Sequence, residues 1–232
     1  VARHAQTGRL RGNPFSSIDC ALHHHLLTLG RKLLIQPSCR LCRAPLGSTA
    51  EAEPICPPCR ERFRLHSDGL HGSAPLPWHG LTDYDGAFRS LLLQLKRLPN
   101  ESRLSALINC LRATLPTLAT AVLVPIPSWK RRRANPLPGL IATGLGRVRS
   151  DLLQRTRASA GQHHLNRQQR LANLSGAFRA RPHAPAMELW LVDDILTTGG
   201  TALAARQALL DGGHRVHGLI CMGRTPVRPL RR

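Results

Sequence analysis

Residues 189–202 read LWLVDDILTTGGTA, and this stretch decides the fold. Its first four residues, Leu189 to Val192, are apolar and typical of a short buried strand. Two carboxylates and an apolar pair follow, and then two threonines, two glycines and a third threonine. The glycines permit a tight turn that presents successive backbone N–H groups to an anion. The Ala/Leu-rich segment that comes next predicts a helix, whose positive dipole end would lie at the same place.

These parts together favour a site for a sugar phosphate. Asp193 and Asp194 would accept hydrogen bonds from ribose hydroxyls or hold a magnesium ion through water. The phosphate would be bound by the loop that follows, formed by Thr197, Thr198, Gly199, Gly200 and Thr201. The alternative is an ordinary strand–turn–helix unit with acidic residues at a strand end. The complete order of acidic pair, threonines and glycines favours the phosphate site, and it resembles the motif of type I phosphoribosyltransferases that binds phosphoribosyl pyrophosphate (PRPP).

The composition limits the fold and the partners. A chain of 232 residues can bury a full α/β core with a small appendage. The formal net charge of +20 comes almost entirely from arginine, because only three residues are lysines. Such an excess favours polyanions, so single-stranded DNA is a candidate partner. No apolar run reaches the length of a membrane span, and three histidines at 23–25 interrupt any signal-peptide core. We therefore expect a cytoplasmic protein without membrane insertion.

Four of the seven cysteines form two C-x2-C pairs, Cys39/Cys42 and Cys56/Cys59. This spacing can supply four thiolates to one tetrahedral zinc, which would be structural because no coordination position stays open. The alternative is that these cysteines are unligated or form a redox pair. The other three, Cys20, Cys110 and Cys221, are expected to be small buried residues.

The remaining pattern predicts the domain organisation. We expect a leader and helix over 1–35, the zinc knuckle over 36–67 and a Gly/Pro-rich linker over 68–80. A main domain over 81–226 and a basic tail over 227–232 would follow. In the main domain, helices near 88–96, 104–111 and 202–210 alternate with strands at 121–124, 189–192 and 216–221. This alternation predicts a twisted parallel sheet with helices on both faces.

Two arginine-rich segments are candidates for contact with the ligand. Lys130 to Arg133 follow a buried strand that ends in Val124-Pro125-Ile126-Pro127. Ligands collect at the carboxyl ends of such strands, so this basic run is expected to face an anion. The polar segment Gln154 to Phe178 is long for a simple connection, which makes it a candidate for a loop that closes over the site.

The order of several separate blocks resembles the ComF family of phosphoribosyltransferase-like proteins. The blocks are the two cysteine pairs, Tyr84-Asp85-Gly86 leading to Lys96, the strand ending at Pro127, Arg155-Thr156-Arg157, Gln162, Leu165, Arg170, Asn173, Phe178 and the stretch from Asp193 to Thr201. The resemblance implies a type I phosphoribosyltransferase-like fold with PRPP and magnesium as ligands. It also implies a role in DNA uptake and natural transformation, alongside other competence proteins such as a DNA helicase.

The resemblance and the residue chemistry together give two hypotheses. In the first, Mg²⁺, Lys96 and Arg131 stabilise a leaving pyrophosphate, while the loop 197–201 anchors the 5-phosphate and the Asp pair holds the ribose. In the second, the protein is a competence factor that binds single-stranded nucleic acid on the same fold without transferase activity. One departure from the family favours the second: Arg133-Ala134-Asn135-Pro136-Leu137-Pro138 replaces the usual R-G-F-N-Q-like block near the pyrophosphate.

Overall fold

The computed structural model describes residues 37–46, 54–117, 121–128, 134–156, 176–181 and 186–226. Several features expected from the sequence lie outside these residues. They are the helix at 18–35, Cys20, the basic run with Arg131, most of the segment expected to close over the site, and the tail from 227 onward.

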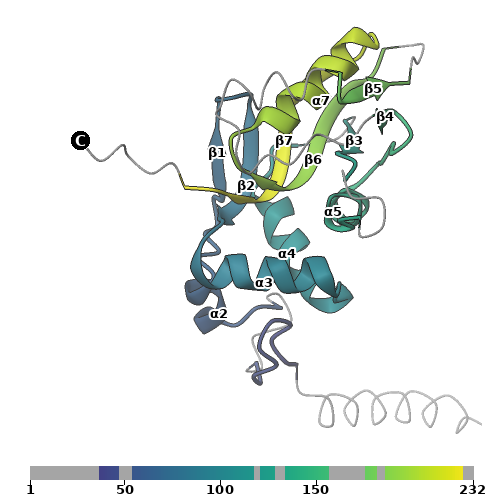
Figure 1. The fold of residues 1–232 in the computed structure, drawn as a ribbon. Coiled ribbons are helices and arrows are strands. Elements are labelled where there is room, and N and C mark those ends of the chain that lie inside the picture. The colour runs from purple at the N-terminus through teal and green to yellow at the C-terminus, as the bar shows by residue number, and fades with distance from the viewer. Residues whose placement is uncertain are drawn as a thin grey trace, which may run out of the picture.

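A five-stranded sheet forms the centre of the fold (Figure 1), in the order β1-β2-β7-β6-β3. Its strands are β1 (Leu70–Gly72), β2 (Trp78–Asp83), β7 (Arg215–Arg224), β6 (Glu188–Leu196) and β3 (Val122–Pro125). All neighbours pair in parallel except β1, which is antiparallel to β2 at one edge. The predicted α/β class with a largely parallel sheet is therefore confirmed. The sheet orders the chain so that β6, with its acidic pair, lies between β7 and β3.

Helices pack on both faces of this sheet. Their bounds are α2 (Pro57–Arg62), α3 (Gly86–Arg97), α4 (Glu101–Thr114), α5 (Leu137–Leu145) and α7 (Gly200–Asp211). Figure 1 shows α3 and α4 together between the sheet and the four-cysteine lobe, and α7 beside β5 at the opposite end of the view. Buried residues of α3, α4 and α5 join one hydrophobic cluster with one side of the sheet. The buried residues of α7 join a second cluster on the other side.

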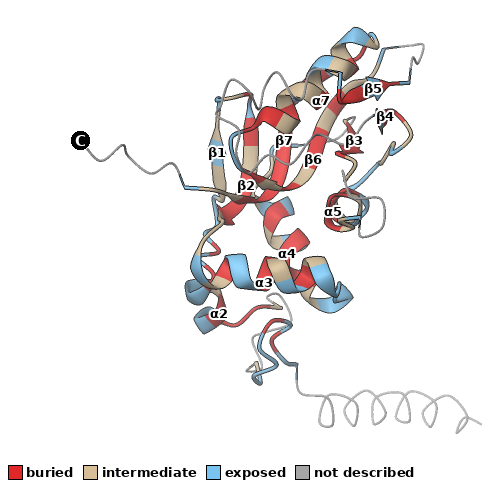
Figure 2. Ribbon diagram, viewed as in Figure 1, coloured by how far each residue is buried: buried red, intermediate tan, exposed pale blue. Residues whose placement is uncertain are grey.

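The sequence explains why α3 and α4 form where they do. In α3, Phe88, Leu91, Leu92 and Leu95 follow helical spacing and are all buried, as the stripe in Figure 2 shows. In α4 the side chain of Asn100 caps the first turn by accepting a hydrogen bond from the Arg103 N–H at 2.9 Å. Both helices lie close to the bounds that periodicity predicts.

A short antiparallel stem brackets the long arginine-rich segment. Strand β4 (Leu153–Arg155) pairs with β5 (Phe178–Ala180), so Arg155 lies opposite Phe178. The stem packs on the same cluster as α7 through Leu153, Phe178 and Ala180. Residues 153–155 and 178–180, which flank the arginine-rich segment, are thereby held together beside α7.

The linker expected over residues 68–80 is a wrong prediction. This segment contains β1 and the first half of β2, joined by a turn in which the Trp78 indole N–H donates to the Ala74 carbonyl at 3.1 Å. Its two prolines lie in the turn, whereas Gly72 and Gly80 lie within the strands. The flanking residues become strands because β2 pairs with β7, more than a hundred residues away in sequence, which local composition does not reveal.

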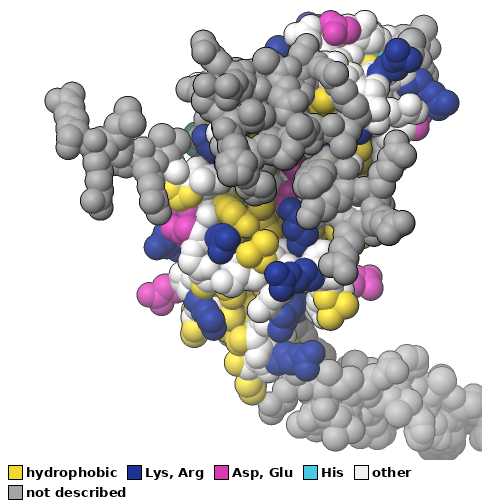
Figure 3. Space-filling model, viewed as in Figure 1, with side chains coloured by type: hydrophobic (Ala, Val, Ile, Leu, Met, Phe, Trp, Pro, Cys, Tyr) yellow, Lys and Arg dark blue, Asp and Glu magenta, His cyan; other side chains and the backbone are white. Residues whose placement is uncertain are grey.

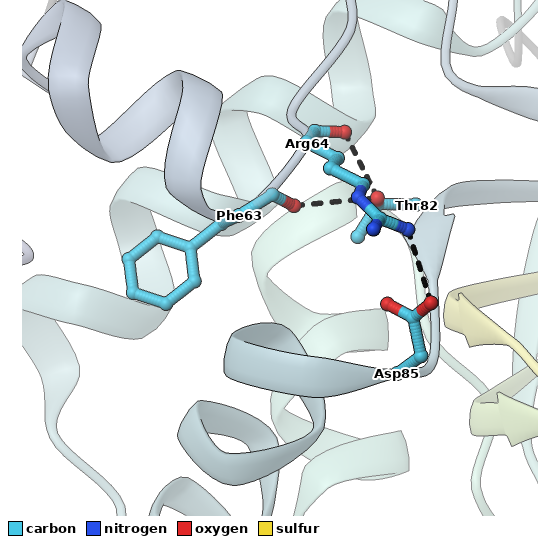
Figure 4. Close-up of polar contacts among 4 residues, drawn as sticks. All are labelled: Phe63, Arg64, Thr82 and Asp85. Carbon is cyan, nitrogen blue, oxygen red and sulfur yellow. Dashed lines mark hydrogen bonds and ion pairs between the residues drawn. The ribbon is translucent and has the colours of Figure 1, made fainter.

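The four-cysteine lobe does not form a hydrophobic core of its own. Its buried residues, among them Cys39, Ile55 and Phe63, belong to the cluster that contains Leu81, Phe88 and Leu92 of β2 and α3. Figure 4 shows the polar contacts at this junction. The buried Thr82 hydroxyl lies 2.9 Å from the Arg64 carbonyl and 3.3 Å from that of Phe63, and it can donate to both. The lobe is therefore packed on the sheet and on α3.

Candidate functional site

The loop between β6 and α7 lies at the carboxyl edge of the parallel sheet. Thr197 and Thr198 are exposed, and Gly199 adopts a left-handed conformation with φ of 80°. A Cβ atom at Gly199 would lie 2.1 Å from Cγ of Pro75, so the turn between β1 and β2 presses against this loop. Glycine is required there both for its conformation and for the close approach.

A cation from a neighbouring strand fixes the same loop. Arg224, at the end of β7, donates from its guanidinium to the Leu196 carbonyl at 3.0 Å and to the Thr197 carbonyl. The Thr225 N–H donates to the Leu196 carbonyl at 2.9 Å. With these carbonyls held, the exposed Thr197 and Thr198 lie just before the amino end of α7. Such an arrangement suits an anion.

Asp194 is buried and forms an ion pair with Lys96. The Lys96 ammonium donates to Oδ2 of Asp194 at 2.7 Å, and the Asp194 side chain is 6% exposed. Lys96 lies near the end of α3, almost one hundred residues earlier in the chain. The structure therefore brings together two residues that the sequence assigned to one site from separate blocks.

Asp193 has a different environment from its neighbour, because successive side chains of a strand point to opposite faces. It lies opposite Cys221 of β7, and its charge interacts with that of Arg155 on β4. Burial and the nearby Asp194 carboxylate raise the pKa of Asp193 well above its ordinary value, although the charge of Lys96 opposes this. Burial and then Asp193 raise the pKa of Cys221 to about 12. Asp193 therefore carries a charge that the protein alone stabilises poorly.

The structure thus places most of the predicted residues at one edge of the sheet. Asp193, Asp194, Lys96 and the loop 197–201 meet there, while Arg131 lies outside the described residues. Reasoning from individual motifs missed three neighbours, Pro75, Cys221 and Arg224, and it gave Arg155 only as part of the segment 154–178. For Arg224 a signal existed, since it follows the predicted strand 216–221 by three residues, at the same edge as the acidic pair. For Pro75 there was none, because the turn that carries it was read as a linker.

The four cysteines expected to bind metal form a compact cluster. Their sulfur atoms all lie within 4.8 Å of one another, and those of Cys42 and Cys56 are 3.6 Å apart. A tetrahedral site with metal–sulfur bonds of about 2.3 Å needs sulfur atoms about 3.8 Å apart. The arrangement fits a metal such as zinc. Within the described parts of the chain, no other group of three or more possible ligands comes together in this way.

The thiols of this cluster differ in their acidity. Burial opposes ionisation of Cys39, but hydrogen bonds from backbone N–H groups, first that of Cys56, lower its pKa to about 6. The N–H of Cys56 lies 3.4 Å from that sulfur. Burial and the neighbouring sulfurs raise the pKa of Cys59. A metal would therefore find one thiolate already formed and would displace protons from others.

Several positive side chains lie on the face of the molecule that Figure 3 shows. Figure 3 shows Lys and Arg over α3 and the four-cysteine lobe, with Asp and Glu mostly toward the edges of the view. The exposed arginines of these elements are Arg40, Arg43, Arg62, Arg64, Arg89 and Arg97. Among the residues that the structure describes, no helix is long and apolar enough to cross a membrane.

Known proteins resemble this chain over most of its length. Two adenine phosphoribosyltransferase structures, from Leishmania tarentolae and Leishmania donovani, cover 55% and 66% of it, and 73% of their own chains. Their sequence identities are 17% and 16%, with TM-scores of 0.34 and 0.37. The chain matches no protein-family model.

Curated relatives give higher identity. The DNA utilization protein YhgH of Escherichia coli (strain K12) is 30% identical over 226 residues, covering 83% of this chain and 99% of that protein. YhgH of Salmonella typhimurium (strain LT2) is 30% identical over 227 residues, with the same coverage. This chain therefore belongs to the family of the DNA utilization protein YhgH.

Proposed function

We propose that the protein binds PRPP or a related sugar phosphate with Mg²⁺ at the carboxyl edge of its sheet. The observation that carries this proposal is the fixed loop from Thr197 to Gly199, which lies next to the acidic pair and opens into α7. The threonine hydroxyls and the N–H groups of α7 would bind the 5-phosphate. The ribose hydroxyls would then meet Asp193 and Asp194.

Charge at the site suits a polyphosphate with a divalent cation. Asp193 and Asp194 supply the oxygen ligands that Mg²⁺ prefers, directly or through water. When bound, Mg²⁺ would neutralise part of the charge on the pyrophosphate. Lys96 already lies at this edge, 2.7 Å from Asp194, and its ammonium would add a second positive charge. Arg131 is proposed as a further cation, and 162–170 as the segment that closes over the ligand. Such a site would support transfer of a phosphoribosyl group to an acceptor.

Titration calorimetry with PRPP and Mg²⁺ tests the assignment. We expect the wild-type protein to bind, and Asp193→Ala to lose most of that binding. Asp211→Asn is the matched control, because it removes a carboxylate at the far, exposed end of α7. No binding by the wild type, or equal binding by Asp193→Ala, would show that the site is misassigned. Release of pyrophosphate with candidate acceptor bases would separate binding from transfer.

The cellular role that we propose is in the use of DNA taken up by the cell. This rests on the relatives named DNA utilization protein and on the resemblance to the ComF family. The protein would act in the cytoplasm, where a reducing environment keeps the four cysteines available for metal. Deletion of the gene should lower transformation frequency or growth on external DNA. An unchanged phenotype in both assays would exclude this role.

Binding of single-stranded nucleic acid is the second candidate function. The net charge of +20 and the exposed arginines over α3 and the lobe favour it. Binding driven by phosphate contacts should weaken steeply with salt, with a slope of about −0.7 per phosphate neutralised in log–log form. A flat salt dependence, or no binding at low salt, would rule out this mode.

We also propose that the metal of the four-cysteine cluster is a structural zinc. Four thiolates would close its coordination and leave no place for a substrate. Metal analysis of the purified protein should give one zinc per chain, and the Cys56→Ser variant should contain no bound zinc. Protein that folds and functions without zinc would contradict the assignment.

A further inference from the structure

A row of aromatic side chains crosses the sheet near the amino ends of its parallel strands, away from the phosphate loop. The row consists of His71 on β1, His79 on β2, Trp190 on β6 and His217 on β7. Ring centroids are 6.2 Å apart for His71 and His79, and 5.6 Å for His79 and Trp190. Trp190 and His217 are stacked at 6.0 Å with an angle of 25° between their planes. Three of the four residues are histidines, of which the chain has twelve, and Trp190 is one of its three tryptophans.

The backbone is adapted to hold the central ring. A Cβ atom at Gly218 of β7 would lie 2.8 Å from the Trp190 ring and 2.4 Å from the Pro77 carbonyl oxygen. Glycine at this position therefore lets the indole approach the backbone of the neighbouring strand and reach toward His79 on the strand beyond. Trp190 packs partly against the cluster of α3 and α4, but part of its surface stays in solvent. His71 and His217 at the two ends are exposed.

One carboxylate beside the end of the row, that of Glu188, contacts two nitrogen-bearing side chains. Glu188 accepts from Nε2 of His217 at 2.5 Å and pairs with Arg215 at 3.2 Å. Burial, and then the proximity of His71, lower the pKa of His79. Near neutral pH the centre of the row therefore presents uncharged rings. The Arg215 side chain, 79% exposed, supplies a cation beside them.

The ring geometry and the charges near the row indicate which kind of ligand this surface could bind. A metal site is excluded for the described residues, because only the four cysteines bring three or more ligands together. Bases stack on exposed aromatic rings, and their phosphates need nearby cations. The net charge of +20 favours a polyanion over a neutral or cationic peptide. We propose that the row His71–His79–Trp190–His217 is a stacking surface for a base of single-stranded nucleic acid. This inference rests on the second candidate function and gives it a location.

Two substitutions at the same position test it by fluorescence anisotropy with a labelled oligothymidine across a salt series. Trp190→Leu keeps apolar bulk against the cluster but removes the ring, whereas Trp190→Phe keeps a ring. We expect Trp190→Leu to weaken binding about 5- to 150-fold at every salt concentration, since each stacked base contributes about 1–3 kcal/mol. The salt slope should not change, because stacking releases no counterions. Trp190→Phe should stay within a few-fold of the wild type.

Further variants distinguish a loss of affinity caused by lost stacking from one caused by lost charge or by destabilised folding. Arg215→Gln should reduce the salt slope, unlike Trp190→Leu. Zinc content, melting temperature and PRPP binding should stay at wild-type values in Trp190→Leu. If that variant melts early, His71→Ala removes an exposed ring from the end of the row and should still weaken binding without a change of slope.

The outcomes distinguish this inference from the function on which it rests. Wild-type affinity in both Trp190→Leu and His71→Ala overturns the stacking surface while nucleic-acid binding stands. An equal loss in Trp190→Phe and Trp190→Leu also overturns it, because the loss would then not depend on a ring. Failure of the wild-type protein to bind the oligothymidine at any salt overturns both proposals.

Discussion

At the scale of single residues, the acidic pair shows two carboxylates with different roles in the fold. Asp194 forms an ion pair with Lys96 on the α3 side of β6, whereas Asp193 faces Cys221 and Arg155. The motif predicts that both carboxylates lie at the carboxyl edge of the sheet. It does not predict their partners, because Lys96 and Arg155 come from distant segments whose packing depends on the whole fold.

The raised pKa of Asp193 gives a prediction about stability. Its ordinary value is 3.8, so between that value and the raised one the folded state binds more protons than the unfolded state. Stability contributed by this group therefore falls as pH rises through that window. We expect Asp193→Asn to raise the melting temperature by about 2–4 °C near neutral pH. The gain should shrink toward pH 4, and Asp211→Asn should show neither effect. A lower melting temperature for Asp193→Asn near neutral pH would contradict this account.

The Lys96–Asp194 pair gives a second prediction. Lys96→Met leaves a buried carboxylate without its cation, which should destabilise the protein by about 2 kcal/mol, less than for a fully buried pair because Lys96 is 35% exposed. Replacing both residues, as Lys96→Met with Asp194→Asn, should recover most of the loss. Urea unfolding measures these changes, and Arg97→Met, at the exposed neighbouring position, is the control. If the double variant is as unstable as Lys96→Met, the pair is not the cause.

At the scale of elements, periodicity predicted those segments whose apolar spacing is regular. Helices α3, α4 and α7 and strands β3, β6 and β7 lie within a few residues of their expected bounds. Helix α5 was not predicted, because its nine residues include one proline and two glycines, which are poor helix formers. It forms because Leu137, Ile141 and Ala142 are fully buried against the sheet and α4. Tertiary packing here outweighs local propensity.

The junction between the lobe and the sheet gives a prediction at this scale. Thr82→Val keeps the shape of the side chain but removes the hydroxyl that faces the carbonyls of Phe63 and Arg64. Because these carbonyls lose a buried donor, we expect a loss of about 1–2 kcal/mol in the free energy of unfolding. Zinc should also transfer faster to a competing chelator. Ser67→Ala, which removes an exposed hydroxyl of the lobe, should leave both measurements unchanged. Equal rates of zinc transfer in Thr82→Val and the wild type would show that this contact does not hold the lobe.

At the scale of the whole molecule, the sheet joins two clusters with different tasks. One cluster contains the buried cysteines of the lobe together with α3, α4 and α5, and it supports Lys96 and Trp190. The other contains α7 and the β4–β5 stem, and it supports the phosphate loop. Strands β6 and β7 contribute to both, so neither cluster can be lost without exposing one face of the same sheet.

This shared sheet predicts that the lobe and the main domain unfold together. If the lobe had its own core, zinc would be released at a temperature below that at which the sheet melts. Because Cys39, Cys56 and Cys59 pack in one cluster with Leu81 and Phe88, we expect zinc release and loss of the sheet to share one midpoint on heating. A colorimetric chelator and circular dichroism, recorded on the same sample, measure the two events. PRPP with Mg²⁺ should raise both midpoints equally, since a ligand of the folded state stabilises the whole cooperative unit. Zinc release several degrees before the sheet melts would show instead that the four-cysteine lobe is an independent domain.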